Sequence, residues 1–166
     1  MLTYTVNVRG PMVRGASAGV VDRAMSAALT ELGHVGQALV VKRTPAGVSS
    51  GGGGLRGSIF TEQRGRGVQR TQLIASSVAY APFVEIGRQP GRRPPIGPIL
   101  LWVRRKLQVA PQQEQRVAFL VARKIGAVGY RGYGMFQHAA TQLQPIVQRR
   151  FQKLAADLSA QLGGGR

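Results

Sequence analysis

The chain has 166 residues, of which 43% are hydrophobic, so it is expected to fold as one domain with a short tail. It contains no cysteine, which excludes disulfides, thiolate nucleophiles and cysteine-based zinc sites. No apolar run approaches the ~18 residues of a membrane span, so no association with a membrane is expected.

The charge is large and unevenly distributed. Twenty-three Lys and Arg against six Asp and Glu give a net charge of +17. Residues 1–87 carry nine basic and four acidic side chains, a net charge of +5, whereas residues 88–166 carry fourteen and two, a net charge of +12. Two interpretations stay open: a surface that contacts a polyanion such as nucleic acid, or a basic surface that is only solvated.

The residue pattern in the first half of the chain predicts a strand, a helix and a loop. Strict alternation of apolar and polar residues predicts a half-buried strand over 2–9. A helical stripe of apolar residues predicts a helix over 17–40, with Ser17 as N-cap. Gly33 and Gly36 weaken its last third, unless a neighbour packs closely there. The glycine-rich residues 44–54 predict a flexible loop, either free or ordered only against a partner.

A hairpin and four helices are predicted to follow. Strands over 55–61 and 68–79 flank the turn sequence EQRGRG. A short helix over 80–87 has Pro82 in its first turn and Gly87 just past its end. Three longer helices are expected: 98–108, opened by Pro98; 112–127; and 135–162, with a kink or a true start at Pro145. The fold class is therefore α+β, in a single domain over 1–162 with a loose tail at 163–166.

Catalytic chemistry has little support in the sequence. The six carboxylates are scattered, and neither His34 nor His138 has a partner at metal-ligand spacing. There is no Gly-x-Ser-x-Gly elbow, and the glycine-rich run over 126–134 indicates a flexible loop rather than a phosphate cradle. No enzymatic activity, metal or cofactor is expected. Recognised nucleic-acid modules are also missing, so any contact with DNA is expected to involve its backbone without sequence preference.

The helix over 80–87 is the first candidate site. Its apolar side chains either maintain the fold or contact a partner: Tyr80, Pro82, Phe83 and Val84. Glu85 is the sole acidic residue between Glu62 and Glu114, and a buried carboxylate needs a partner. The candidate partners belong to this chain or to a neighbouring subunit: Arg88, Arg92 and Arg93.

The basic cluster between residues 88 and 106 is the second candidate site. It is expected to face DNA or an acidic partner, or else to be a solvated face, and it comprises Arg88, Arg92, Arg93, Arg104, Arg105 and Lys106. Trp102 is on the apolar face of its predicted helix and is expected in the core.

Three stretches, in order, resemble one known family. They are TPAGVSSGGGGLRGSIFTE, then VAYAPFVEIG, then RPPIGPILLWVRRKL followed by AFLVARKIGAVGYRGYGMFQHA. Together they are similar to the tail-completion, or head–tail joining neck, family of tailed bacteriophages over roughly residues 17–155. YAPFVEIG is the specific part of the likeness. It marks a family motif or subunit contact made by Tyr80, Ala81, Pro82, Phe83, Glu85 and Gly87.

The resemblance implies a structural virion protein that is not an enzyme. Members form a ring, typically a hexamer, which joins the connector or stopper to the tail tube or tail terminator and surrounds the DNA channel. The implied location is the virion, after assembly in the host cytoplasm. The alternative is a basic protein that binds nucleic acid non-specifically.

Overall fold

The computed structural model describes residues 2–7, 18–46, 54–67 and 69–163. The chain divides into two compact units. The sheet unit comprises Met1–Arg43, Ile59–Ser77 and Met135–Arg166, and the helical unit comprises Thr44–Ser58 and Val78–Gly134. The single domain over 1–162 stays a prediction.

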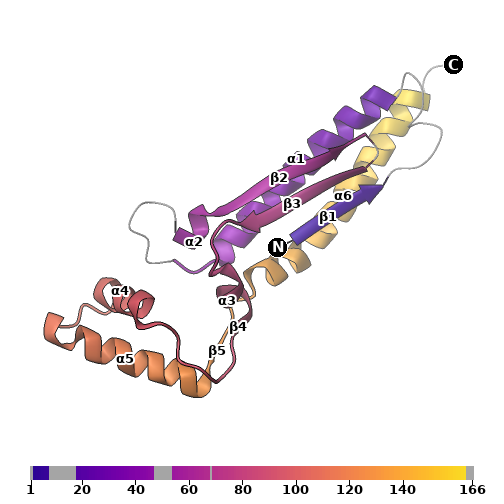
Figure 1. Cartoon of the computed structure of the whole chain (residues 1–166). Helices are drawn as coiled ribbons and strands as arrows, with labels where there is room; N and C mark the ends of the chain where they lie inside the picture. Colours follow the sequence, from indigo (N-terminus) through magenta and orange to yellow (C-terminus); the bar gives the residue numbers. More distant parts are fainter. Residues whose placement is uncertain (1, 8–17, 47–53, 68, 164–166) are drawn as a thin grey trace. The chain divides into compact units, whose positions relative to one another are not determined.

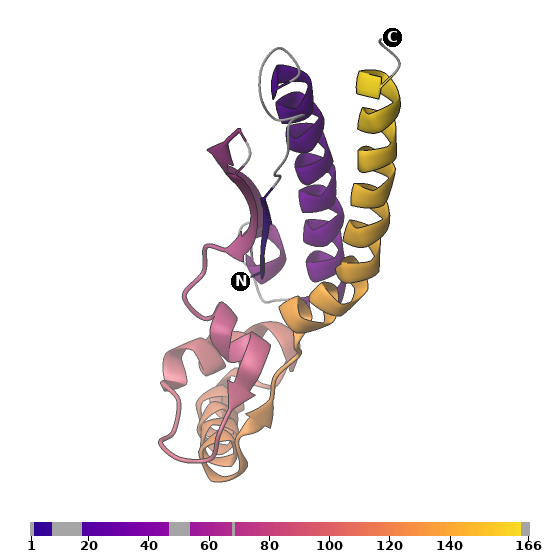
Figure 2. The same cartoon turned by 90° about the vertical axis from the view of Figure 1, so that its right-hand side faces the viewer.

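The predicted α+β class is confirmed by the sheet unit. Its sheet has the order β1-β3-β2, with both neighbouring pairs antiparallel, and comprises β1 (Leu2–Asn7), β2 (Ile59–Arg66) and β3 (Gln69–Ser76). Two long helices, α1 (Ala18–Arg43) and α6 (Met135–Gly163), run side by side in opposite directions, with α1 against the sheet (Figures 1 and 2).

The helical unit holds the remaining elements. In chain order they are α2 (Gly54–Gly57), α3 (Ala81–Ile86), β4 (Gly87–Arg88), α4 (Ile96–Lys106), α5 (Pro111–Val128) and β5 (Tyr130–Arg131). Helices α4 and α5 pack on each other, and β4 pairs with β5 antiparallel.

Several predicted boundaries were wrong. Residues 55–57 belong to α2 and not to a strand, because Ser58 donates its N–H to the carbonyl of Gly54 and closes a helical turn. Strand β2 continues through most of EQRGRG, so that Arg66 pairs with Gln69 and the connection shrinks to two residues. Helix α4 begins at Ile96, two residues before Pro98, and a proline is tolerated there because first-turn N–H groups have no helical partner.

Other predicted boundaries are confirmed or lie outside the described residues. Pro82 lies in the first turn of α3 and Gly87 follows its last residue, as predicted. Pro145 lies inside α6 and does not mark its start, and Figure 2 shows α6 bent in its N-terminal half. Ser17, most of the loop over 44–54 and the side-chain alternation over 2–9 lie outside the described residues.

The core of the sheet unit follows the two predicted apolar stripes. Near one end it is built from Val21, Met25, Ala28, Leu154 and Leu158. Farther along α1 the buried face includes Gly33 and Gly36, while Val35 and Leu39 are only half-buried. The close-packing interpretation of the two glycines is therefore the one the structure supports.

Gly36 is buried because side chains from the sheet and from α6 approach its backbone closely. A Cβ atom at this position would collide with Ile74 Cδ1 and would lie 2.8 Å from Leu143 Cδ2. We expect Gly36→Ala to lower the free energy of unfolding by about 1–3 kcal/mol, since overpacking exceeds the gain in helix propensity. Gly19→Ala on the same helix is the control, because its Cβ would meet only Arg23 Nη1 at 3.8 Å. Urea denaturation that shows equal effects for both variants would contradict the packing argument.

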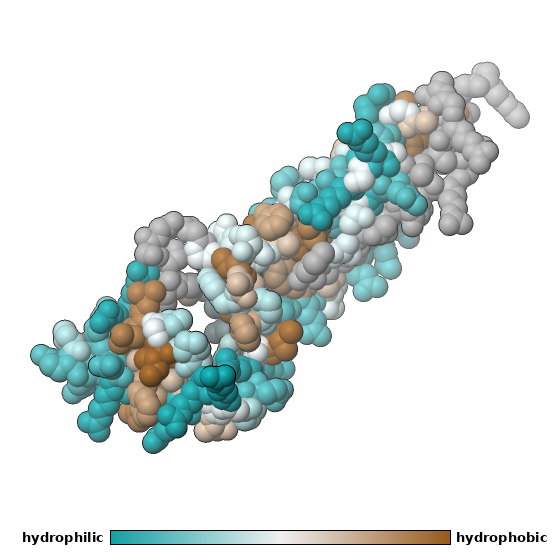
Figure 3. All heavy atoms as spheres, viewed as in Figure 1, coloured by the Kyte–Doolittle hydropathy of each residue, from teal (hydrophilic) through white to brown (hydrophobic). Residues whose placement is uncertain are grey.

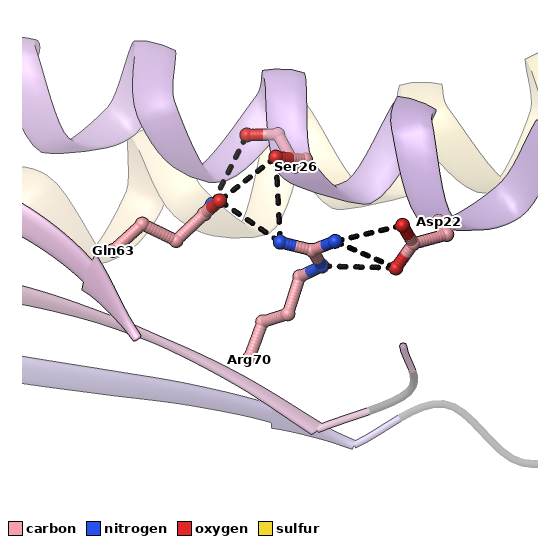
Figure 4. A network of polar contacts seen from close by, with 4 residues as sticks. All are labelled: Asp22, Ser26, Gln63 and Arg70. Carbon is pink, nitrogen blue, oxygen red and sulfur yellow. Dashed lines mark hydrogen bonds and ion pairs between the residues drawn. The ribbon is translucent and has the colours of Figure 1, made fainter. Parts of the chain in front are cut away.

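A polar network fixes α1 on the sheet (Figure 4). Arg70 on β3 donates from Nη2 to both carboxylate oxygens of Asp22 at 2.7 Å, and from Nη1 to Gln63 Oε1 at 3.0 Å. Ser26 on α1 donates to the same Gln63 oxygen at 2.8 Å. The Arg70 side chain is only 11% exposed, so its charge depends on these partners.

The Asp22–Arg70 pair predicts a pH dependence of stability. The hydrogen bonds from Arg70 hold the pKa of Asp22 below its ordinary value of 3.8. A carboxyl whose pKa is lowered by folding stabilises the folded state above its unfolded pKa, and this contribution is lost as the pH falls through the folded pKa. We expect Asp22→Asn to destabilise the protein at pH 6 and the difference from the wild type to shrink below pH 3.8. A difference that stays constant from pH 6 to pH 2 in thermal melts would contradict it.

Candidate assembly surface

The motif YAPFVEIG forms α3 and the turn after it. Tyr80 is the N-cap residue of α3, and Pro82 lies in the first turn, where no helical N–H bond is lost. Gly87 has φ +87° and ψ −161°, a conformation almost confined to glycine, and its N–H bonds to the carbonyl of Phe83. The chain therefore turns sharply out of α3 into β4.

The GYRGYG run lies directly against this turn. Gly87 pairs with Arg131, and the N–H of Tyr133 donates to the carbonyl of Val84 at 2.8 Å. The N–H of Gly134 donates to the carbonyl of Glu85 at 3.0 Å. The run was predicted to be a flexible loop, and this is wrong, because its backbone is paired with the motif. Two sequence signatures more than 40 residues apart thus form one surface.

The motif residues divide into two groups by exposure. Ala81 is buried at 6% exposure and Gly87 is held against the backbone of β5, so these two maintain the fold. Tyr80, Phe83 and Ile86 are exposed at 49%, 52% and 80%. Tyr80 and Phe83 are therefore not core side chains, which disfavours the alternative that they only maintain the fold. Pro82 is exposed as well, and Val84 and Glu85 are half-buried.

Several members of the basic cluster make contacts within the chain. Arg88 donates to the carbonyl of Arg92 at 2.8 Å, and Arg93 lies over the Phe119 ring at 5.3 Å, a cation–π distance. Arg104 is paired with Glu114 at 2.6 Å. Arg92, Arg105 and Lys106 are exposed. The prediction that Glu85 pairs with Arg88, Arg92 or Arg93 stays a prediction.

Apolar side chains are exposed on α4 and α5. Trp102 is 40% exposed, so its predicted place in the core is wrong. The buried contact of α4 is made by Val103, which packs toward α5, where Ala118 and Ala122 are fully buried. Small alanines let the two helices approach closely and leave larger side chains outside. Figure 3 shows hydrophobic residues gathered at the surface over α4 and α5, beside hydrophilic ones.

Three further members of this surface were not predicted from the sequence: Ile86, Tyr130 and Tyr133. Tyr130 and Tyr133 are 40% and 53% exposed, and the Tyr130 hydroxyl donates to the carbonyl of Phe83 at 3.2 Å. The only signal was the alternation of glycine with tyrosine in GYRGYG. Alternating glycines allow close backbone approach, while the tyrosines between them face outward.

The histidine and carboxylate side chains of the described residues do not form a metal-ligand group of three or more. His34 and His138 are both exposed. The contact described for His138 joins its Nε2 to Nε2 of Gln142, one turn along the same helix, at 3.1 Å. In the same part of the chain, none of the helices combines the length and apolar character that crossing a bilayer requires.

Comparison with known proteins adds no further assignment: no protein-family model matches the chain, and neither a curated protein nor a solved structure does.

Proposed function

We propose that this protein is a structural virion component that forms a homo-oligomeric ring at the phage head–tail junction. The ring joins the connector to the tail tube and surrounds the DNA channel. The resemblance of YAPFVEIG and its neighbouring stretches to tail-completion proteins suggests this role. The observation that carries the proposal is the exposed apolar surface built around that same motif.

The exposed apolar residues are concentrated in one unit. Of the thirteen large hydrophobic residues exposed in the described part of the chain, twelve lie in the helical unit and only Phe60 lies in the sheet unit. A monomeric protein seldom keeps so many large apolar side chains in water, because covering them stabilises the protein by about 25 cal/mol per Å². Such a surface is typical of a chain whose contacts are completed by neighbours.

The charge is consistent with the proposed location. Copies that each carry +17 repel one another, so a ring of them needs negative charge nearby. DNA in the channel supplies such charge, and contacts with its backbone are weak and blind to sequence. An attraction of this kind holds the duplex without stopping its passage.

The oligomeric state tests the proposal. We expect discrete oligomers in light scattering and negative-stain microscopy, either alone or on mixing with a connector or tail-tube protein. Phe83→Ser is expected to weaken assembly by at least about 30-fold, as the loss of a central aromatic anchor does. Phe60→Ser is the control, because Phe60 is also an exposed phenylalanine, at 38%, and lies in the sheet unit. A chain that stays monomeric at high concentration with and without these partners would refute the proposal, as would its absence from mature particles.

Non-specific binding to nucleic acid is the second candidate function, and the net charge of +17 favours it. If a monomer binds duplex DNA, log affinity should fall linearly with log salt, by about 0.9 for each phosphate contact. Replacing Arg92, Arg105 and Lys106 together with glutamine should reduce that slope. The control replaces three exposed basic residues of the sheet unit: Arg66, Arg149 and Lys153. Equal slopes for the wild type and both variants would exclude the cluster as the DNA contact.

A further inference from the structure

A groove of about 350 Å³ lies within the helical unit, between the β4 turn and the end of α5. Its walls come from residues 86–90 and from Val128, Tyr130 and Arg131. Ile86 and Val128 are the two most exposed large apolar residues described, at 80% and 63%. The volume is that of a small ligand site, and two arginines, Arg88 and Arg131, line the groove beside the apolar Ile86 and Val128.

The two guanidinium groups belong to Arg88 and Arg131. Arg88 donates one bond, from Nη2, to the carbonyl of Arg92, which anchors the group while its other N–H groups stay available. Arg131 is exposed, and its backbone is fixed by pairing with Gly87. A pair of arginines on a short, backbone-locked strand pair is suited to carboxylates, which accept two parallel N–H bonds from each guanidinium.

We propose that this groove binds a short acidic segment of a partner protein, with aliphatic side chains against Ile86 and Val128 and carboxylates on Arg88 and Arg131. This interaction goes beyond the proposed ring and does not depend on it. The occupant follows from charge complementarity together with the apolar walls. A nucleic-acid backbone would satisfy the arginines, but it has no aliphatic groups to cover Ile86 and Val128.

A second copy of this chain is a poor occupant. The protein has only six carboxylates, and four of them are paired within the chain, in Asp22–Arg70, Glu31–Arg150, Glu62–Arg64 and Glu114–Arg104. The negative charge that complements the two arginines is therefore expected from a different polypeptide.

A contact of this size is weak for one copy, with a Kd of about 0.1 mM expected. If several copies are held in one assembly, the weak contacts combine, and overall affinity rises by about 100-fold or more. The groove is therefore expected to bind a partner in a single chain and to hold it more strongly in an assembly of several copies.

The test uses the full chain and a fluorescein-labelled peptide of about twelve residues in which aspartate and leucine alternate. Fluorescence anisotropy should show binding at 150 mM salt. Arg131→Gln and Val128→Ser should each weaken it about tenfold, because one removes a charge-assisted hydrogen bond and the other an apolar contact. Arg123→Gln is the charge-matched control on the exposed side of α5 and should change the affinity less than about twofold.

Two further peptides test separately the contribution of the carboxylates and that of the aliphatic side chains. Replacing every aspartate with lysine should abolish binding, and replacing every leucine with serine should weaken it about tenfold or more. The inference is overturned if the wild type does not bind the aspartate–leucine peptide, or if Arg123→Gln weakens binding as much as Arg131→Gln. It is also overturned if the serine peptide binds equally well.

The other occupants are distinguished by two measurements on the same variants. If Arg131→Gln and Val128→Ser weaken binding of a duplex DNA equally, the groove takes nucleic acid and the inference is wrong. If they reduce self-association in light scattering, the occupant is a second copy and the inference is again wrong. Failure of the ring proposal is seen separately, in the response of assembly to Phe83→Ser.

Discussion

Gly87→Ala is expected to destabilise the helical unit by about 3 kcal/mol or more. Gly87 lies at φ +87° and ψ −161°, where a non-glycine residue costs about 1–3 kcal/mol. An added Cβ would also collide with the carbonyl oxygen of Tyr130 and lie 2.9 Å from the carbonyl carbon of Arg131. These are backbone atoms of the paired strand, so they cannot rotate away as a side chain does. The strand pair β4–β5 should separate.

Tryptophan fluorescence provides the measurement, because Trp102 is the only tryptophan and lies in the helical unit. The urea midpoint of its signal should fall in Gly87→Ala, and protease cleavage within residues 78–134 should accelerate. Gly97→Ala is the control in the same unit, since its Cβ would meet nothing within 4 Å and it lies in the first turn of α4. That variant should be neutral or up to about 1 kcal/mol more stable. A Gly87→Ala midpoint equal to that of the wild type would contradict the argument.

The separation of β4 from β5 also links fold and surface. The Tyr130 hydroxyl donates a hydrogen bond to the carbonyl of Phe83, and the N–H of Tyr133 donates one to the carbonyl of Val84. The exposed aromatic residues of α3 and of GYRGYG are therefore held in place by this pairing. Gly87→Ala should therefore weaken assembly as well as stability, whereas Phe83→Ser should weaken assembly alone. The comparison of the two variants separates a contact residue from a residue that positions the contact.

Long periodic segments were predictable from the sequence. The stripe that includes Val21, Ala28 and Leu32 predicted α1, and these three residues are buried. The repeat through Leu143, Leu154 and Leu158 predicted α6 in the same way. Over more than six helical turns, one buried stripe is the pattern that packing against a neighbour requires. Local signals were enough here because the same face is buried along most of the helix.

Short elements and exposure were not predictable in the same way. Strands β4 and β5 have two residues each, which is too short for any period, and their pairing depends on contacts between distant segments. Trp102 shows the second limit. An apolar helix face indicates that this face is buried, but it does not show whether the same chain or a partner protein covers it. The same ambiguity concealed the exposure of Phe83 and Ile86.

The candidate surface was therefore predicted only in part. The motif residues were selected by their pattern, and Pro82 and Gly87 were placed correctly at the two ends of α3. The groove residues Val128 and Arg131 were missed, because they reach it only through the pairing of GYRGYG with the motif. Net charge indicated a polyanionic or acidic neighbour, but charge has no periodicity that would locate the contact.

Leu143→Ala should strongly destabilise the sheet unit, with a loss of about 3 to 4 kcal/mol in the free energy of unfolding. Leu143 is fully buried on α6 and lines a cavity of about 10 Å³ together with Leu29, Ile74 and Phe151. Removing its terminal carbons enlarges a space that is already present, and neighbours on two helices and a strand cannot close it without moving those elements. This loss is a large fraction of the stability of an ordinary domain.

The matched variant is Leu143→Met, which keeps the volume of the side chain and should cost less than about 1.5 kcal/mol. Circular dichroism reports all the helices, of which α1 and α6 are the longest, so its urea midpoint should fall strongly for Leu143→Ala and little for Leu143→Met. If the Trp102 signal shifts by the same amount, the two units unfold together, as the single domain over 1–162 predicts. If Trp102 keeps its own midpoint, the units unfold separately and that prediction is wrong. Equal midpoints for the alanine and methionine variants would show that the space at Leu143 closes freely, contrary to the packing described for α1, β3 and α6.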